Sequence, residues 1–298
     1  MIKRFIKNES ANATFLVTIS FTGLLALTGL VVDGGLLYST HADLQKSANA
    51  AVLSGGQELT EEQEVVQQIV DETLTYHEEL DSLIETTIIP ERRVTVELEK
   101  PVGTTFMQLF GVDSVDVNVD ATARIAVMGR ATGVAPLGID KSVDLEYGEE
   151  YTLKVDESGV DTGFFGILAL DGPGARTYKE TLLHGSDGEF KIGDVIDTQT
   201  GNIAGPTKEA VDILVNSCSD MDEPDCRRIL LIPVYEPYNH NQNQMKEVKI
   251  VGFAHFYLTE PMDGDEKTIK GIFIKEIDKG FEEDGAVNRG AFIVKLSE

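Results

Sequence analysis

The residues best suited to catalysis lie in a short polar segment in the second half of the chain. Residues 184–188 read His-Gly-Ser-Asp-Gly, which brings a base, a nucleophile and a carboxylate within five positions. The order is not the G-x-S-x-G of a nucleophile elbow. Glycine alternating with short polar residues is typical of a turn between a helix and a strand. We therefore predict a turn here, no catalytic residue, and a protein that is not an enzyme.

A second candidate is the acidic segment between the two cysteines, CSDMDEPDC. Carboxylate oxygens suit Ca²⁺, but the EF-hand pattern, with Gly at position 6 and Glu at position 12, does not follow. A solvated acidic loop is the interpretation we favour, so we assign no metal ligand and no cofactor. The acidic residues concerned are Asp220, Asp222, Glu223 and Asp225.

The segment GNIAGPT, residues 201–207, could bind an anion through its backbone amides if a helix begins there. Proline is common in the first turn of a helix, because its missing N–H has no partner there in any case. We predict a helix entry around Pro206, formed by Asn202, Gly205, Pro206 and Thr207, and identify no small-molecule substrate.

Cys218 and Cys226 are the only cysteines. An even count in an oxidising compartment predicts a disulfide between them. Two free thiols remain the alternative. A pair without histidine or a second Cys-x-x-Cys is a poor zinc site.

The chain that positions these groups has an uncharged apolar stretch near its N-terminus, residues 10–32. Its 23 residues are enough to cross a hydrocarbon core of about 30 Å as one helix. Lys3, Arg4 and Lys7 precede it and Asp33 closes it, so the positive-inside rule predicts residues 1–9 in the cytoplasm and the rest outside. The alternatives are a cleaved secretory signal, a prepilin-type leader and a buried core helix. The pattern fits each of them less well than it fits a retained single-pass anchor.

Helical spacing of apolar residues continues beyond the anchor to about Ser54, where Gly55 and Gly56 predict the end of the helix. A second helix is predicted from Thr60, with an apolar stripe that would fold back on the first. That stripe consists of Val65, Ile69, Thr73 and Tyr76.

Alternating residues then predict strands at 92–99 and 114–127, separated by a short helix at 104–110 that Gly111 ends. Beyond a Gly- and Pro-containing segment at 129–138, short strands dominate. We therefore predict an α+β fold. A long N-terminal transmembrane helix (10–32) continues into a membrane-proximal helix and sheet layer (33–128), and a β-rich extracytoplasmic domain (129–298) follows.

The formal net charge is −26, which argues against nucleic acid or an anionic membrane surface as a partner. Trp is absent, and no aromatic platform for sugars or bases stands out. An acidic, soluble outer domain is the plain interpretation of this charge.

The segment VVDGGLLYSTHADLQKSANAAVLSGGQEL resembles the N-terminal region of tight-adherence (Tad/Flp) pilus-assembly proteins of the TadE/TadG type. The resemblance continues in residues 101–127, and residues 162–207 resemble the ectodomain of a subset of these proteins. The metal-binding sequence of a von Willebrand A domain, Asp-x-Ser-x-Ser, does not occur, so we expect a short form without that domain. The positions that match are Asp33, Tyr38, Leu44, Gln45, Ala48, Asn49, Ala50 and Ala51.

The resemblance implies a membrane-anchored accessory protein of a pilus or secretion apparatus, whose partners are other membrane-embedded pilus-assembly or pilin-like proteins. Small residues permit close helix approach in lipid, so we predict partner contacts at Gly23, Gly29, Ala48 and Ala51. The alternative is a cell-surface ligand-binding or hydrolytic ectodomain on a generic anchor.

Overall fold

The computed structural model describes residues 9–154, 165–199, 203–221, 223, 226–238, 246–263 and 267–297. It divides into two compact units, residues 1–124 with 296–298 and residues 125–295. Lys3, Arg4 and Lys7 of the predicted cytoplasmic flank lie outside the described residues. The domain bounds given above, 33–128 and 129–298, remain our proposal.

The first unit is built on one helix, α2, which runs from Glu9 to Gln57. The predicted end at Gly55 is wrong, because the helix continues through both glycines. A Cβ on Gly55 would lie 2.6 Å from Cγ2 of Val70, so the missing side chain lets the next helix pack closely. Gly55 is therefore a packing residue and not a helix stop.

Helix α3 (Gln63–Tyr76) packs against the C-terminal half of α2. The predicted stripe is wrong by one position, since Val66, Val70 and Leu74 are buried and Tyr76 is 86% exposed. The predicted stripe (Val65, Ile69, Thr73) and the buried one (Val66, Val70, Leu74) both have helical spacing, so only contact with α2 shows which one is buried.

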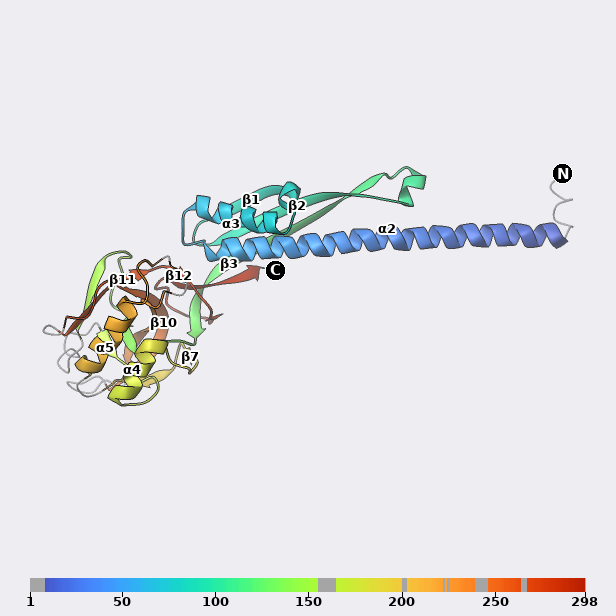
Figure 1. Ribbon diagram of the computed structural model, residues 1–298. Coiled ribbons are helices and arrows are strands. Elements are labelled where there is room, and N and C mark those ends of the chain that lie inside the picture. Colours follow the sequence, from blue (N-terminus) through green and yellow to red (C-terminus); the bar gives the residue numbers. More distant parts are fainter. Residues whose placement is uncertain are drawn as a thin grey trace. The chain divides into compact units, whose positions relative to one another are not determined.

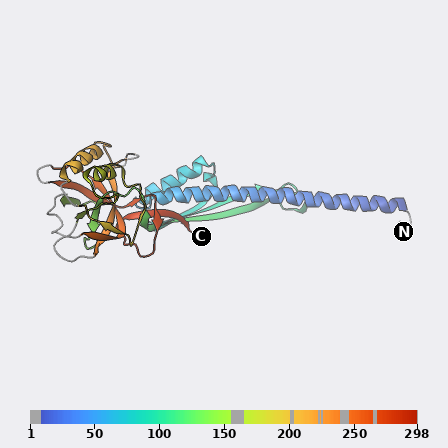
Figure 2. The ribbon, with the colours of Figure 1, turned by 90° about the horizontal axis from the view of Figure 1, so that it is seen from below.

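After the 3₁₀ turn η1 (Leu80–Ser82), the first unit contributes three strands that pair antiparallel in the order β1-β2-β3. Strand β1 (Leu83–Ile89) was not predicted, whereas β2 (Arg93–Gly103) and β3 (Ser114–Ala131) were. β2 and β3 form a long hairpin, paired from Arg93↔Arg124 to Gly103↔Ser114. The hairpin runs alongside α2 and ends part-way along it (Figures 1 and 2), with the 3₁₀ turn η2 (Met107–Phe110) at its tip.

Alternation along β2 and β3 forms the core of this unit, as predicted. Val94, Val96 and Leu98 of β2 are buried, and so are Val119 and Ala121 of β3. β2 contacts α2 directly. One face of the C-terminal half of α2 is thus covered by the sheet and α3.

The second unit holds a mixed sheet in the order β5-β11-β10-β9-β4-β6, with β8 also paired to β10. β4 is parallel to β9 and the other pairs are antiparallel. The last residues of β3 pair with β7 and β13, and β12 pairs with β14. The bounds are β4 Leu137–Asp140, β5 Glu150–Lys154, β6 Phe165–Ile167, β7 Phe190–Lys191, β8 Val195–Asp197, β9 Ile229–Tyr238, β10 Glu247–Leu258, β11 Thr268–Ile274, β12 Glu276–Ile277, β13 Phe281–Glu282 and β14 Ala291–Ser297.

Two helices of this unit, α4 (Ala175–His184) and α5 (Ala204–Val215), pack against each other. Val211 and Leu214 of α5 join Leu182 of α4 and the sheet residues Phe256 and Phe273 in one apolar core. The α+β class predicted from the sequence is confirmed.

Candidate functional site

Within the part of the chain that the structure describes, one helical segment, Ala13–Gln57, is long and apolar enough to cross a bilayer. Its N-terminal half presents large apolar side chains that no other element covers. Such a continuous apolar surface fits lipid far better than water. The exposed fractions lie between 47% and 72% for Phe15, Leu16, Val17, Ile19, Phe21, Leu24, Leu25, Leu27, Leu30, Val31 and Val32.

Asp33, the first charged residue after this surface, is only 1% exposed. Its carboxylate accepts hydrogen bonds from three successive backbone N–H groups at the hairpin tip, those of Thr105 (2.9 Å), Phe106 (2.8 Å) and Met107 (2.6 Å). A charged acceptor with three donors is a strong, directional link. Asp33 therefore fastens the tip of the β2–β3 hairpin to α2.

Gly29 lies one helical turn before Asp33 and is covered by the ring of Phe106. A Cβ at Gly29 would come within 2.5 Å of Cγ of Phe106. The glycine thus provides the space into which the ring packs, which reinforces the link made by Asp33.

The half of α2 beyond Asp33 contacts the sheet. Leu44, Ala48 and Ala51 are 0% exposed, and Nε2 of Gln45 donates to the carbonyl oxygen of Asp120 on β3 (2.9 Å) and to Oδ1 of Asn49 (3.1 Å). These small and amide side chains let the helix lie close against the sheet.

These contacts bear on the predicted partner interface, which remains a proposal. Ala48 and Ala51 are enclosed by their own unit and Gly29 is covered by Phe106, so these three positions do not present a free helix face. Gly23 has nothing within 4 Å of a Cβ built on it, and a partner contact there remains a proposal.

In a comparison with models of known protein families, the match falls on this same helix. Residues 11–58 match the family model described as "Putative Flp pilus-assembly TadE/G-like". The resemblance of the N-terminal segment is confirmed. No curated protein and no solved structure matches the chain.

The structure shows what several of the matching positions in the TadE/G-like segment contact. Asp33 holds the hairpin tip, Gln45 contacts β3, and Leu44 and Ala48 fill the interior. Tyr38, another matching position, differs from these residues because its side chain is 76% exposed.

The candidate hydrolase segment of the second unit forms a turn, as predicted. The Ser186 hydroxyl donates to Asp171 and accepts from the N–H of Gly188 (3.1 Å). Asp171 also accepts from Thr181 Oγ1 (2.6 Å). Ser186 is 2% exposed, so its hydroxyl closes the turn after α4.

The two cysteine sulfurs, Cys218 and Cys226, lie at disulfide distance. Of the acidic residues between them, Asp222 and Asp225 lie outside the described residues. Oε1 of Glu223 accepts from the backbone N–H of Ser219 (2.9 Å) and Asp220 (3.2 Å). The described residues contain no group of three or more His, Cys, Asp or Glu placed to hold a metal.

At the start of α5, Asn202 lies outside the described residues. Thr207 is fully buried, donates to the carbonyl of Ile203 (2.8 Å) and contacts the Tyr178 hydroxyl (3.2 Å). Burial raises the pKa of Tyr178 far above its ordinary value. Thr207 thus stabilises the helix entry that the sequence predicts.

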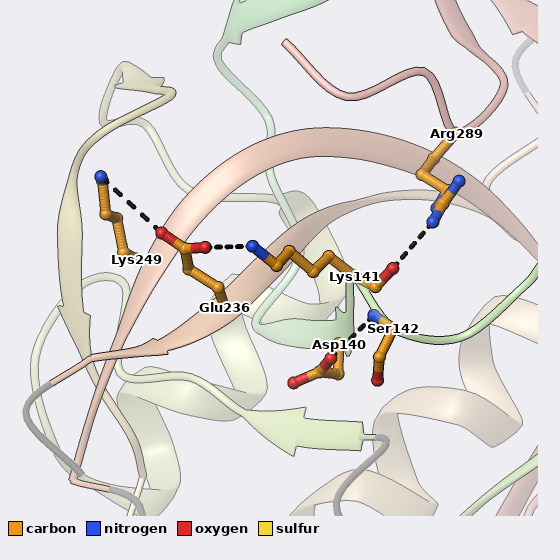
Figure 3. Close-up of polar contacts among 6 residues, drawn as sticks. All are labelled: Asp140, Lys141, Ser142, Glu236, Lys249 and Arg289. Carbon is orange, nitrogen blue, oxygen red and sulfur yellow. Dashed lines mark hydrogen bonds and ion pairs between the residues drawn. The ribbon is translucent and has the colours of Figure 1, made fainter. Parts of the chain in front are cut away.

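An ionic cluster joins strands of the second unit (Figure 3). The Glu236 carboxylate on β9 pairs with Lys141, which follows β4, and with Lys249 on β10 (3.7 Å). Arg289 donates to the carbonyl oxygen of Lys141 (2.7 Å). The hydrogen bond from Lys141 and the charges of both lysines hold the pKa of Glu236 below its ordinary value, although burial opposes this. The cluster ties strands together and leaves Glu236 no role as a proton donor near neutral pH.

Sequence reasoning predicted a short helix ended by Gly111 at 104–110, where the structure has the 3₁₀ turn η2, but it missed the Asp33 link. The partners of Asp33 are backbone N–H groups more than seventy residues away, which leave no side-chain pattern to detect. The available signal was the apolar composition of the tip, FMQLFGV, which is unusual for a turn.

Proposed function

We propose that this protein is a membrane-anchored accessory protein in the assembly of a Tad/Flp-type pilus or a related secretion apparatus. The observation that carries the proposal is the TadE/G-like match over the helix whose residues 13–28 expose only apolar and small polar side chains. The basic flank of Lys3, Arg4 and Lys7 supports a cytoplasmic N-terminus and an extracytoplasmic remainder.

The partners in this proposal are other membrane-embedded pilus-assembly or pilin-like proteins. In lipid no hydrophobic force drives helices together, so association depends on close packing at small residues. Of the two glycines in the span, Gly23 is the one that the hairpin leaves uncovered. The face around Gly23 is therefore where a partner helix would pack.

The test is chemical crosslinking in native membranes followed by isolation of the full-length protein. Gly23→Leu should reduce the recovery of pilus-assembly components and the output of pili, because a larger side chain separates the helices. The matched control is Thr28→Leu, which places the same side chain about 140° around the helix, at 100° per residue.

Equal recovery with both variants would remove the support for a partner at Gly23. Normal pilus or secretion output in cells lacking the protein would contradict the assembly role altogether. That outcome would favour the alternative of a ligand-binding or hydrolytic ectodomain on a generic anchor.

A further inference from the structure

The tip of the β2–β3 hairpin, residues 104–113, exposes apolar side chains in an otherwise acidic protein. Leu109 and Phe110 are each 80% exposed and Val112 is 37% exposed. Residues 101–112 contain no charge, although the chain carries a formal net charge of −26. The one charged residue of the tip is Asp113 at its end, which is exposed, so the turn at 106–112 itself carries no charge that would repel it from anionic lipid.

The level of the tip along α2 is fixed by the contacts described above. Phe106 packs on Gly29 and Asp33 binds the three N–H groups, so the tip lies beside the last apolar turn of the helix. Gly29 and Asp33 are about 6 Å apart along the helix axis, at 1.5 Å per residue. The hairpin extends toward the N-terminal end of α2 (Figure 1), which is the apolar end.

Much of the backbone of the tip is hydrogen-bonded within the protein, as a medium without water requires. In lipid, each backbone N–H group needs a partner within the protein. Asp33 supplies this for three N–H groups, and turn hydrogen bonds satisfy four more. Those four, at 3.0–3.2 Å, are donated by Thr104, Leu109, Gly111 and Val112.

We propose that the hairpin tip inserts into the outer leaflet of the bilayer, with Leu109 and Phe110 in contact with lipid beside the end of the transmembrane helix. The inference rests on the proposed anchoring by residues 10–32. The Asp33 carboxylate then sits at the membrane boundary, shielded by the N–H groups that it binds. The first unit is thereby attached to the membrane at two places and not by a single flexible connection.

The absence of Trp from the sequence makes the test direct, because one introduced Trp reports its own surroundings. The full-length Phe110→Trp variant is reconstituted in vesicles of phosphatidylcholine and phosphatidylglycerol. We expect the Trp emission maximum at a shorter wavelength than that of a Trp in water. Lipids brominated near the headgroup end of the acyl chain should quench this fluorescence, and iodide in the water should not. Leu109→Trp repeats the measurement at the neighbouring exposed position.

Two controls separate this inference from the anchoring itself. Leu24→Trp lies in the middle of the span and should be quenched by lipids brominated deeper in the chain. Tyr76→Trp, on the exposed end of α3, should be quenched by iodide alone. Failure of Leu24→Trp would overturn the anchoring.

If Leu24→Trp behaves as expected while both tip variants are open to iodide, the anchoring stands and the tip inference is wrong. Tip variants that are shielded from iodide but not quenched by any brominated lipid would also overturn it, since a protein surface would then cover the tip.

Discussion

The burial of Ala48 gives the sharpest test of how the TadE/G-like helix is used. If Ala48 faced a partner helix, replacing it with Leu would leave the first unit folded and weaken only the association. The structure places Ala48 at 0% exposure, in a part of α2 that contacts both α3 and β2. Ala48→Leu must therefore fit three additional carbon atoms into a filled core.

Overpacking of this kind typically costs about 1–3 kcal/mol. Ala42→Leu is the matched control, because Ala42 lies on the same helix and is exposed. The same substitution there should change stability by less than about 0.5 kcal/mol. The difference between the two variants isolates the packing effect from the change in helix propensity.

Hydrogen–deuterium exchange of the full-length protein, read by mass spectrometry over β2, measures this locally. Where exchange follows opening of the unit, a loss of 1–3 kcal/mol speeds it between about 5-fold and 150-fold. Equal exchange in the Ala48→Leu and Ala42→Leu proteins, together with loss of crosslinked partners from Ala48→Leu alone, would refute the buried position and restore a partner contact there.

Three further predictions follow from the contacts. Gly55→Ala should speed hydrogen exchange in β2, because the new Cβ meets the stiff side chain of Val70. This clash should outweigh the gain in helix propensity of about 1 kcal/mol. The control is Gly35→Ala, which has open space around it and should slow exchange. Because the pKa of Glu236 is lowered on folding, its contribution should be present above the ordinary value of about 4.3 and lost as pH falls through the lower folded pKa. The exchange difference in β9 between Glu236→Gln and wild type should close in that acid range, and a difference that persists at low pH would contradict this. Cys218 and Cys226 should give a non-reduced mass two hydrogens below the reduced mass, and full thiol labelling without reductant would exclude the disulfide.

The parts of the fold set by local alternation or composition were predictable from the sequence. β3 alternates Val117, Val119 and Ala121 with polar residues, and α5 begins beside Pro206 as expected. The register of α3 was not predictable, because Val65–Ile69 and Val66–Val70 have the same spacing and only α2 distinguishes them. The prediction for Gly55 was wrong for a related reason. Glycine is favoured both at the end of a helix and where another helix packs closely, and the sequence alone does not distinguish the two.

The candidate site was less predictable because its decisive contacts are long-range and use the backbone. An aspartate directly after an apolar span is expected at any membrane boundary, so the sequence marks Asp33 as the end of the anchor and no more. Its binding of three N–H groups at residues 105–107 becomes visible only once β2 and β3 form a hairpin of the right length. The length of that hairpin, set by eleven paired positions from Arg93 to Gly103, brings the tip to the level of Gly29.

This arrangement changes what the TadE/G-like segment implies about function. Within 11–58, residues near Gly23 face outward, whereas Asp33, Gln45 and Ala48 hold the chain's own hairpin and sheet. The matched segment therefore describes mainly a helix that carries its own hairpin and sheet, while its residues 13–28 stay exposed. A generic anchor needs neither a buried aspartate at its end nor a glycine that receives a ring from a distant hairpin. The presence of both favours an assembly role, in which the orientation of the first unit at the membrane matters, over a tether that only retains an ectodomain.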